Sequence, residues 1–529
     1  MKRIFSLYEG GIELKRLLGG KGAGLAEMYK LGIPVPPCFI ITTDAWREWR
    51  SNKELSEPLK AEIYENIKRL EEVTGKRFGG RHNPLLVSVR SSPPVSMPGM
   101  LDTVLNLGLN DVTVQGLIEA TNDERFGYDC YRRFVGSFGR VVLGVDKERL
   151  DEVLESYKIK LGVKRDSELS ADVLKEIVRE YKALIKRETG KDFPDDVYDQ
   201  LFSAVQAVFN SWFNPRAVAY RQAEKIPEDL GTAVIVQAMV FGNMGDDSGT
   251  GVMFTRDPST GEKKLYAEYM PNAQGDDLVS GARTPESIEW LRERFPKLYE
   301  ELVSVADKLE RHLKDMQDVE FTVEKGKLYV LQTRSGKRSA LATAKIAFDM
   351  YMEGIIDREE AIRRIKAVSS DVTICQRDLT VNVKALAKGL PASPGVASGV
   401  VALTPEEAVE LKEKGYQVIL VRPETSPEDI RGILAADGIL TSRGGMTSHA
   451  AIVSRSLNKP CVVGCEAIKI DLEAGVCYVY DGPTVVTLKR GDVITIDGTT
   501  GEVFMGKIPT VAQRLYEYLE KIVQQINVR

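Results

Sequence analysis

Histidine is scarce in this sequence, and long apolar runs are absent from it. Three of the 529 residues are histidines: His82, His312 and His449. Any chemistry that needs an imidazole is therefore confined to three positions. No stretch reaches the roughly 18 consecutive apolar residues of a membrane-spanning helix, and the N-terminus lacks the pattern of a secretory signal. We therefore expect a cytoplasmic protein that has no membrane partner.

Cysteine is also uncommon, and its spacing argues against two kinds of site. The six cysteines are scattered along the chain. Cys461 and Cys465 lie four positions apart, but neither a second pair nor a histidine cluster completes a zinc site. A chain of this length gains little from a disulfide framework. We expect buried, reduced thiols.

Neither sign of charge is in large excess. The formal net charge of -5 argues against a nucleic acid or an anionic membrane as a general partner, although a local basic pocket for a nucleotide is still compatible with it. The length of 529 residues predicts three or four domains. The content of 43% hydrophobic and 28% charged residues is that of ordinary globular domains with full apolar cores.

Strand-like and helix-like hydrophobic patterns alternate along the chain, which predicts an α/β or α+β fold. Residues 339–368 read as two charged amphipathic helices with a break at Gly354, and the turn-rich segment Gly389–Gly395 marks the start of a compact unit. Residues 510–526 have apolar side chains at helical spacing. These boundaries predict four segments, 1–338, 339–384, 385–509 and 510–529.

The strongest chemical signal is the segment Thr441–Arg455, TSRGGMTSHAAIVSR. Two glycines predict a tight loop, and the hydroxyl residues after them suit a helix N-cap. His449 should then lie in the first turn of a helix, where free amides and the positive end of the dipole face a phosphate on the ring. Imidazole is a competent nucleophile near neutral pH. The plainer alternative is a ring satisfied by a backbone carbonyl at the start of a helix.

Two further motifs supply basic groups. In Leu18–Met28, LGGKGAGLAEM, glycines let the backbone approach an anion and Lys21 adds a charge, although the spacing is not that of a Walker A loop. In Leu85–Leu109 a strand delivers Arg90, whose planar fork suits phosphate, to its end. The alternatives are a simple turn for the first motif and a surface salt bridge for the second.

The segment Thr232–Asp257 reads as a strand, a glycine-rich loop and a second strand. Such a loop can fold over phosphates with its backbone amides and the hydroxyl of Thr250. The alternative is an ordinary hairpin. Two aspartates in the loop, Asp246 and Asp247, are expected to be solvated rather than to bind a metal.

Carboxylates and polar groups share the faces of two strands in Met316–Arg334. Alternation places Asp318 and Glu320 on one side of the first strand, and Gln332 and Arg334 on one side of the second. A hairpin would bring both pairs together. Carboxylates on rigid strands suit Mg²⁺, which prefers oxygen ligands and usually keeps some of its waters. The alternative is a polar-faced hairpin without a ligand.

These motifs occur in the same order as in the pyruvate phosphate dikinase family, and GGMTSHAAIVSR resembles the phosphorylation motif of that family. The resemblance implies an ATP-grasp-like nucleotide-binding domain (1–338), a helical connector (339–384), a swivelling phosphohistidine domain (385–509) and a linker-like C-terminal helix (510–529). It implies that His449 carries the phosphoryl group and that Thr447 is a regulatory threonine.

The resemblance also implies roles for the other motifs. The residues expected to contact ATP or phosphate are Lys21, Arg90, Thr250, Glu268, Gln274, Gln332 and Arg334. The carboxylates expected to hold Mg²⁺ are those of Glu320 and Asp318. By the same resemblance, His449 attacks the β-phosphorus of ATP, AMP leaves, and inorganic phosphate removes the terminal phosphoryl group as pyrophosphate.

The motifs of the family's acceptor barrel do not follow the phosphohistidine segment, so we expect phosphoenolpyruvate or pyruvate to bind on a separate barrel subunit. Three hypotheses stay open: the nucleotide half of a split dikinase, an autonomous phosphotransferase with another acceptor, and a non-catalytic nucleotide-binding module. The joint presence of Lys21, Arg90, Glu320 and His449 argues against the last, because a sensor does not need the histidine.

Overall fold

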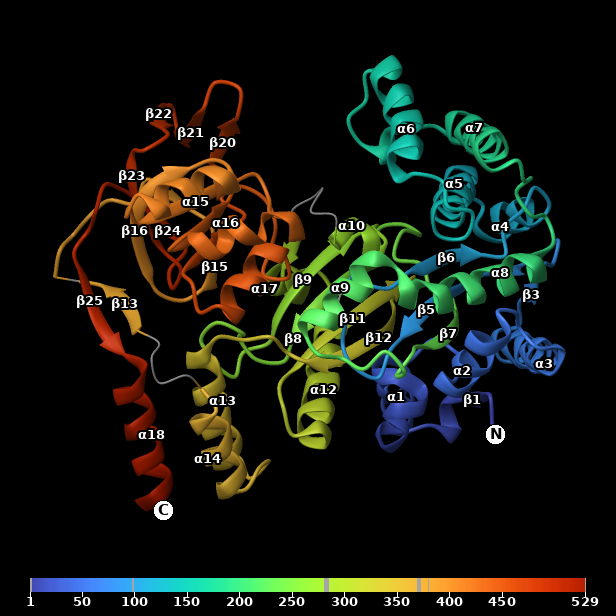
Figure 1. Cartoon of the computed structure of the whole chain (residues 1–529), viewed down its shortest axis with the longest axis horizontal. Helices are drawn as coiled ribbons and strands as arrows, with labels where there is room; N and C mark the ends of the chain where they lie inside the picture. The colour runs from blue at the N-terminus through green and yellow to red at the C-terminus, as the bar shows by residue number, and fades with distance from the viewer. Residues whose placement is uncertain (1, 98, 280–284, 369–372, 379, 529) are drawn as a thin grey trace. The chain divides into compact units, whose positions relative to one another are not determined.

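The computed structural model contains helices and several sheets, which confirms the predicted α/β class (Figure 1). The residues that it describes are 2–97, 99–279, 285–368, 373–378 and 380–528. The chain divides into two compact units. Unit 1 comprises Met1–Met244 and Val323–Thr333, and unit 2 comprises Gly245–Thr322 and Arg334–Arg529.

The first sheet belongs to unit 1 and has the strand order β1-β2-β7-β5-β6. Its strands are β1 (Ile4–Ser6), β2 (Cys38–Ile41), β5 (Val87–Ser92), β6 (Thr103–Leu107) and β7 (Ala233–Ala238). Neighbouring strands are antiparallel throughout. Strand β7 has the sequence AVIVQA and is buried at every position, so it forms the centre of the sheet. The strand predicted to deliver Arg90 is thereby confirmed as β5.

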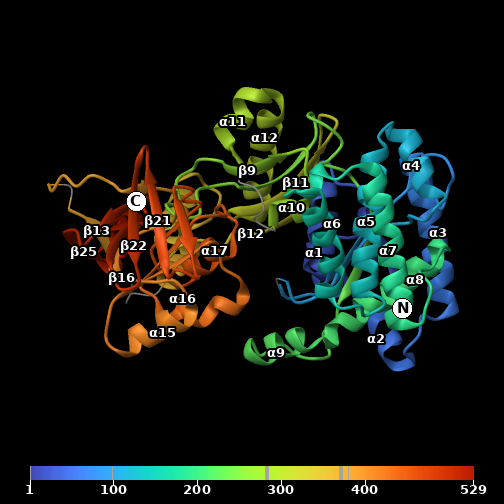
Figure 2. The ribbon, with the colours of Figure 1, turned by 90° about the horizontal axis from the view of Figure 1, so that it is seen from above.

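Helices make up the middle of unit 1. They are α4 (Thr113–Thr121), α5 (Glu124–Val141), α6 (Lys147–Leu161), α7 (Ala171–Thr189), α8 (Val197–Asn210) and α9 (Pro215–Ala223). Figure 2 shows α5 and α7 side by side. Helix α7 begins where the Ser170 hydroxyl caps the amide of Val173 and ends at Gly190, whose φ of 71° is readily adopted by glycine.

The second sheet has the order β10-β9-β8-β11-β12, and the boundary between the units passes through β11 and β12. Its strands are β8 (Gly249–Phe254), β9 (Tyr266–Pro271), β10 (Glu286–Ser287), β11 (Gln317–Glu324) and β12 (Lys327–Ser335). The predicted hairpin between β11 and β12 is confirmed. It turns at Lys325 and Gly326, whose positive φ values of 48° and 76° fit a tight two-residue turn.

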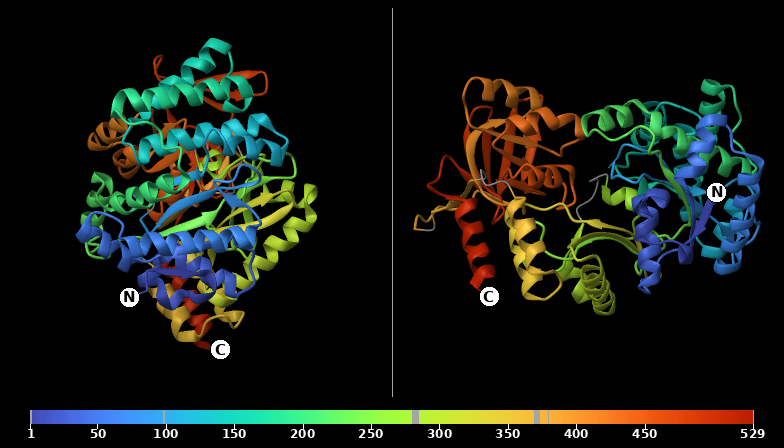
Figure 3. Two further views of the ribbon diagram at one scale, coloured as in Figure 1. Left: turned by 90° about the vertical axis from the view of Figure 1, so that its right-hand side faces the viewer. Right: turned by 60° about the horizontal axis from the view of Figure 1, so that its bottom comes forward.

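The connector contains the two predicted helices, α13 (Ala340–Met352) and α14 (Arg358–Lys366), with the predicted break at Gly354. Helix α18 (Leu515–Val528) packs against them through Leu519, Ile522 and Ile526. In the right panel of Figure 3, this red C-terminal helix lies beside the gold helices of the connector.

The prediction of a single helix over 510–529 is wrong at its start. Residues Thr510–Arg514 form strand β25, which pairs antiparallel with β13 (Thr373–Arg377). The physical reason is that the connector supplies an extended partner, whose backbone hydrogen bonds outweigh a weak local helix preference. The connector 339–384 is likewise not wholly helical, because it contains β13. Residues 369–372 and 379 of that segment lie outside the described residues.

The third sheet carries the segment that contains His449. Its strand order is β14-β24-β23-β16-β17-β18-β19-β15, and β16, β17, β18 and β19 run parallel to their sequential neighbours. The parallel strands are β16 (Val396–Ala402), β17 (Val418–Arg422), β18 (Gly438–Thr441) and β19 (Cys461–Val463). The other strands of this sheet are β14 (Ala387–Lys388), β15 (Leu390–Ser393), β23 (Val493–Asp497) and β24 (Glu502–Met505).

Crossover helices connect the parallel strands, as parallel pairing requires. They are α15 (Pro405–Glu413), α16 (Ile430–Ala435) and α17 (His449–Ser456). A small antiparallel sheet follows, with β20 (Ile468–Asp471), β21 (Val476–Asp481) and β22 (Thr484–Lys489). The division of the chain into four functional segments stays a prediction. In the described part of the chain, no helix combines the length and the apolar character needed to cross a bilayer.

Candidate functional site

His449 is the first residue of helix α17, as the sequence predicts. The Ser448 hydroxyl accepts a hydrogen bond from the amide of Ala451 and so caps the helix. The His449 ring is half-buried rather than sealed in a core. Burial lowers the pKa of this imidazole, and the nearby Asp429 carboxylate opposes that shift. The ring is therefore biased toward its neutral, nucleophilic form.

The recorded partner of the His449 ring is a side chain and not the backbone carbonyl considered above. Thr425 Oγ1 lies 3.0 Å from His449 Nδ1. Thr425 follows strand β17, and His449 follows β18. Because these strands are parallel neighbours, their carboxyl ends meet at one edge of the sheet, where α/β proteins place their ligand sites. The amide of Arg443 ties the two loops together by donating to the Pro423 carbonyl at 2.9 Å.

Glu268, on strand β9 of the second sheet, contacts the loop that carries His449. Its carboxylate accepts a hydrogen bond from the Thr447 hydroxyl at 2.8 Å and another from the backbone amide of Met446. The Glu268 side chain is buried. Burial raises the pKa of its carboxyl group, and this effect is larger than the opposing effect of the hydrogen bonds, which lower the pKa. The resemblance placed Glu268 near the nucleotide. In the structure its carboxylate accepts hydrogen bonds from the loop that carries His449, so direct contact between Glu268 and a nucleotide stays a prediction.

Gly445 and Arg455 also help to position the loop that carries His449. A Cβ on Gly445 would lie 2.0 Å from Glu268 Oε1, so only glycine leaves room for the carboxylate. Arg455, fully buried on α17, donates to the Met446 carbonyl at 2.6 Å and to the Ala392 carbonyl at 3.1 Å. The loop before His449 is therefore held at several points within unit 2.

In unit 1, Arg90 projects from β5 toward the end of the β11–β12 hairpin. Its guanidinium donates to Gln237 Oε1 at 3.2 Å, to the Leu331 carbonyl at 3.3 Å and to Gln332 Oε1 at 3.2 Å. These partners are neutral groups, unlike the carboxylate of the surface salt bridge considered above. Gln237 and Gln332 are buried. The fork of Arg90 thus joins two predicted residues that lie 242 positions apart in the chain.

Lys21 lies in helix α1 (Lys15–Lys30), just after a kink at Gly19. Gly19 has a φ of 73°, and a Cβ there would lie 1.7 Å from the Ser92 carbonyl oxygen. The Ser92 hydroxyl accepts from the amide of Gly22 at 3.0 Å and donates to the Leu18 carbonyl at 2.9 Å. Because Ser92 ends the strand that carries Arg90, this close approach fixes Lys21 and Arg90 in one part of unit 1.

The glycine-rich loop is not the turn of a hairpin. Strand β7 before it belongs to the first sheet and β8 after it to the second sheet, so the loop is a connection between sheets. Thr250 lies inside β8 rather than in the loop, and its buried hydroxyl donates to the Phe321 carbonyl at 3.3 Å. A contact between Thr250 and phosphate therefore stays a prediction, and the bond of the Thr250 hydroxyl to the Phe321 carbonyl does not favour it.

Gln274 follows β9 and is buried. Neither polar atom of its side-chain amide has a hydrogen-bond partner in the described part of the chain. Buried amides without partners are uncommon, and a bound ligand or water usually accounts for them. The unpartnered amide is compatible with the nucleotide-binding role predicted for Gln274, and that role stays a prediction. Residues 280–284, shortly after Gln274, lie outside the described residues.

The predicted carboxylate pair lies on β11, opposite Arg334 of β12. Arg334 Nε donates to Asp318 Oδ2 at 2.8 Å. Burial lowers the pKa of the Arg334 guanidinium, whereas the nearby carboxylates of Asp318 and Glu320 raise it. The effect of the carboxylates is larger, so the pKa is raised overall. Asp318 is itself buried, which raises its pKa, and its Oδ1 has no hydrogen-bond partner among the described residues. A hard oxygen is thus left available beside half-buried Glu320.

The described residues contain no group of three or more histidine, cysteine, aspartate or glutamate side chains suited to hold a metal ion. Two carboxylates on one strand are fewer ligands than a site built by protein alone needs. They fit Mg²⁺ that is carried by a phosphate substrate, because this ion commonly takes one or two carboxylates and completes its shell with phosphate and water.

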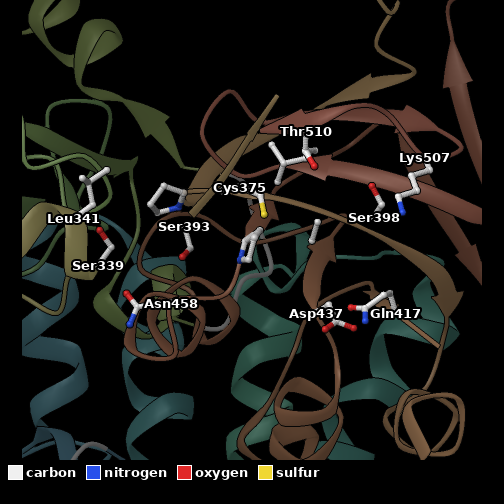
Figure 4. A pocket seen from close by; sticks show the side chains of 15 residues that line it. Ser339, Leu341, Cys375, Ser393, Ser398, Gln417, Asp437, Asn458, Lys507 and Thr510 are labelled. Atoms are coloured by element: carbon white, nitrogen blue, oxygen red, sulfur yellow. The ribbon is translucent and has the colours of Figure 1, made fainter. Parts of the chain in front are cut away.

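A separate cavity of about 300 Å³ lies within unit 2, and none of the predicted site residues lines it. Figure 4 shows Cys375 of β13, Thr510 of β25 and Ser393 of β15 around it. Of the six cysteines, Cys375 is the one that is only partly buried, and the other five are buried as expected. His82 and His312, which the sequence leaves without a role, are both exposed.

Sequence reasoning missed Thr425 and the structural part played by Arg455. Thr425 lies in a run, RPETSPED, that looks like an ordinary loop. The available signal was indirect: it follows a strand that precedes the one leading to His449, and adjacent parallel strands bring such loops together. Arg455 was within the strongest motif, but its burial could not be read from the sequence.

Comparison with known proteins gives two family matches. Residues 15–74, 47–298 and 296–355 match the family model "Pyruvate phosphate dikinase, AMP/ATP-binding domain". Residues 415–501 match "PEP-utilising enzyme, mobile domain", and this range includes both Thr425 and His449.

The chain is also similar over nearly its whole length to curated proteins named pyruvate, phosphate dikinase. It is 50% identical to that of Clostridium symbiosum over 99% of this chain and 60% of the relative. It is 48% identical to that of Rhizobium meliloti over 98% and 59%, and 49% identical to that of Entamoeba histolytica over 96% and 58%. The chain thus spans about three fifths of the length of these relatives. The chain belongs to the pyruvate phosphate dikinase family.

Proposed function

We propose that this chain transfers a phosphoryl group from Mg-ATP to His449. The observation that carries the proposal is the half-buried His449 ring at the capped start of α17, with Nδ1 bonded to Thr425, in a chain that matches an AMP/ATP-binding domain. A neutral imidazole at the N-terminal end of a helix is suited both to attack phosphorus and to hold the charged product.

The reaction that fits best has two stages. His449 attacks the β-phosphorus, the bond to the AMP oxygen breaks, and AMP leaves with the electron pair. Inorganic phosphate then takes the terminal phosphoryl group as pyrophosphate, and one phosphoryl group stays on His449. Phosphoryl transfer depends mainly on positioning and charge. Lys21, Arg90, Gln332 and Arg334 are the groups that we assign to the triphosphate, with Gln274 near the nucleotide and Thr250 as a weaker candidate.

Mg²⁺, when bound with the nucleotide, would offset the charge of the phosphates. Asp318 and Glu320 are the residues that would hold it, since Asp318 Oδ1 is buried without a hydrogen-bond partner and both carboxylates lie on one strand. The ion pair between Arg334 and Asp318 keeps the Arg334 guanidinium at the same place. For Glu268 we propose a docking role toward the phosphohistidine loop, with Thr447 on that loop as a site where modification would interfere.

We further propose that the phosphoryl group goes on to pyruvate, since the relatives carry the name pyruvate, phosphate dikinase. In this scheme 1–338 binds the nucleotide, 339–384 connects, 385–509 swings with His449, and 510–529 returns the chain to the connector. The acceptor site would lie in a barrel that binds phosphoenolpyruvate or pyruvate, and a separate subunit carrying that barrel stays a prediction. An autonomous phosphotransferase with another acceptor is the competing hypothesis.

The test is incubation with ATP labelled in the β position, with and without phosphate. We expect acid-labile label on the wild type and none on His449→Asn. The matched control is His312→Asn, which removes an exposed histidine and should label normally. Equal labelling of wild type and His449→Asn would place the phosphoryl group on another residue and contradict the proposal. No label on either protein with ATP bound would leave only the nucleotide-binding hypothesis.

Pyruvate then separates the acceptor hypotheses. Label that stays on His449 in the presence of pyruvate, and leaves when a barrel protein is added, supports the split reaction. Release to pyruvate by this chain alone would contradict the need for a second subunit. Release to a different small molecule would favour another acceptor.

A further inference from the structure

The contact between Thr425 and His449 decides which ring nitrogen is free. Thr425 Oγ1 is 3.0 Å from His449 Nδ1, while Nε2 takes part in no hydrogen bond recorded for the described residues. A neutral imidazole carries one proton, so one nitrogen donates and the other has the lone pair that attacks phosphorus. The direction of this hydrogen bond therefore sets the identity of the nucleophilic atom.

The loop that carries Thr425 is held in place beside His449. Its neighbour Ser426 donates its backbone amide to Asp429 Oδ2 at 2.7 Å, which closes a tight capped turn. Asp429 also lies 3.5 Å from Arg422 at the end of β17. The amide of Ser442 donates to the Arg422 carbonyl at 3.1 Å. The loop with Thr425 is thus anchored to its own strand and to the neighbouring loop that leads to His449.

We propose that Thr425 is a positioning residue: its Oγ1 accepts a hydrogen bond from Nδ1–H of His449, so that Nε2 bears the lone pair and becomes the phosphorylated atom. The kinetic part of this inference rests on the proposed function. The tautomer itself is a property of the resting protein.

Charge development during the reaction favours this direction over the reverse. When the Nε2 lone pair forms the bond to phosphorus and the bond to the AMP oxygen breaks, the ring gains a formal positive charge and keeps its Nδ1 proton. A hydroxyl oxygen that accepts this proton's hydrogen bond stabilises the charged ring, and the Asp429 carboxylate adds a favourable field. Loss of the Nδ1 proton to solvent then returns the ring to neutrality. If Thr425 donated instead, Nε2 would carry the proton and could not attack.

The test uses two variants at one position. Thr425→Val keeps the shape and removes the hydroxyl, and Thr425→Ser restores a hydroxyl. Thr484→Val, at an exposed position of β22 in the same unit, is the matched control for the loss of a threonine hydroxyl. Thermal unfolding of each full-length variant establishes that it is folded.

The first readout is the tautomer of His449, from the nitrogen chemical shifts of ¹⁵N-histidine-labelled protein. Only three histidines are present, so replacing His82 and His312 by Gln leaves a single imidazole to assign. We expect the proton on Nδ1 in the wild type and in Thr425→Ser, with a shift of population toward Nε2–H in Thr425→Val. A wild type with its proton on Nε2, or a Thr425→Val ring identical to the wild type, would overturn the proposal.

The second readout is the single-turnover rate of His449 labelling at saturating ATP. Loss of one hydrogen bond to a ring that becomes charged predicts a decrease of about tenfold in Thr425→Val, with unchanged ATP affinity and recovery in Thr425→Ser. An unchanged rate in Thr425→Val would contradict the proposal. If the wild type never labels, the proposed function fails, and the tautomer measurement still decides the role of Thr425.

Discussion

The carboxylate of Glu268 accepts a hydrogen bond from the Thr447 hydroxyl at 2.8 Å, two residues before His449. Glu268 lies on a strand of the second sheet, whereas Thr447 lies in the loop that follows β18 of the third sheet. The same carboxylate accepts from the Met446 amide. This buried group therefore holds the loop with the proposed nucleophile against the sheet to which β11, with Asp318 and Glu320, also belongs.

Removal of the Glu268 carboxylate should slow phosphorylation of His449. Hydrogen bonds to charged groups each contribute about 1.5–3 kcal/mol, so Glu268→Ala should reduce the single-turnover rate by about tenfold or more. Glu268→Gln should have a smaller effect, because its amide oxygen still accepts one of the two hydrogen bonds. The exposed Glu262→Gln serves as the control. A wild-type rate in Glu268→Ala would mean that the contact has no part in the transfer.

Gly445 and Glu268 should show strong energetic coupling. A Cβ at Gly445 would lie 2.0 Å from Glu268 Oε1, so Gly445→Ala forces the loop away from the carboxylate and should slow labelling about as much as Glu268→Ala does. In the Glu268→Ala background the obstacle is gone, and adding Gly445→Ala should change the rate by less than about threefold. Labelling rates of the two single variants and the double variant measure this. If the rate decreases of the two single variants multiply in the double variant, Gly445 acts through something other than Glu268.

Much of the fold and of the site follows from local sequence, and the remainder depends on distant partners. The capped helix at His449, the Asp318–Arg334 strand pair and the helix break at Gly354 come from short-range rules of capping, alternation and turn chemistry, which operate within a few residues. Strand β25 formed where a helix was predicted, because β13, more than 130 positions earlier, supplies its partner. The hairpin alternative for the glycine loop failed for the same reason, since sheet membership is set by non-local pairing.

The site shows the same limit. Arg90 could be identified as a strand-end cation, but its neutral partners Gln237 and Gln332 are far away in sequence. Glu268 could be assigned only by resemblance, and its contact with Thr447 requires two sheets to be packed together. Thr425 gave no signal of its own, because a threonine in a proline-rich loop becomes informative only when its neighbouring strand is known.

Substitution of Arg90 by lysine should weaken ATP binding even though the charge is kept. Arg90 uses both terminal nitrogens to reach Gln237, the Leu331 carbonyl and Gln332. A lysine ammonium cannot span these partners and still present a planar fork to phosphate. We expect Arg90→Lys to raise the Kd for ATP by about tenfold, in nucleotide titration by calorimetry, with a larger effect for Arg90→Ala.

The control for Arg90 is Arg311→Lys, which alters an exposed arginine paired with Asp307 on helix α12 (Pro296–Leu313). Its ATP affinity should match the wild type. Thermal unfolding separates lost binding from lost structure, because Arg90 also links β5 to β12. Tight ATP binding by a folded Arg90→Lys protein would show that charge alone suffices at this position.

The pH dependence of His449 labelling should reflect the environment of its ring. Burial lowers the pKa of His449 from its ordinary value of 6.5, and Asp429 partly offsets this. Only the neutral ring attacks, so the single-turnover rate should be constant above pH 6.5 and should fall at more acid pH, with a midpoint below 6.5. The pKa of His449 is lower in the folded protein than in the unfolded chain. The stability that this difference contributes is therefore fully present at a pH above the unfolded-state pKa, and it is lost as the pH falls through the folded-state pKa.

Asp429→Asn removes the carboxylate that favours the charged ring, so the midpoint of the rate profile should move to still lower pH. The amide of asparagine can keep accepting from the Ser426 amide, which preserves the turn that carries Thr425. In parallel, His449→Gln should lose less stability than the wild type when the pH falls from about 7 to 5, because the unfolded chain no longer gains a proton at this position. A midpoint above 6.5, or a shift to higher pH in Asp429→Asn, would mean that the His449 imidazole is not the titrating group that limits the transfer.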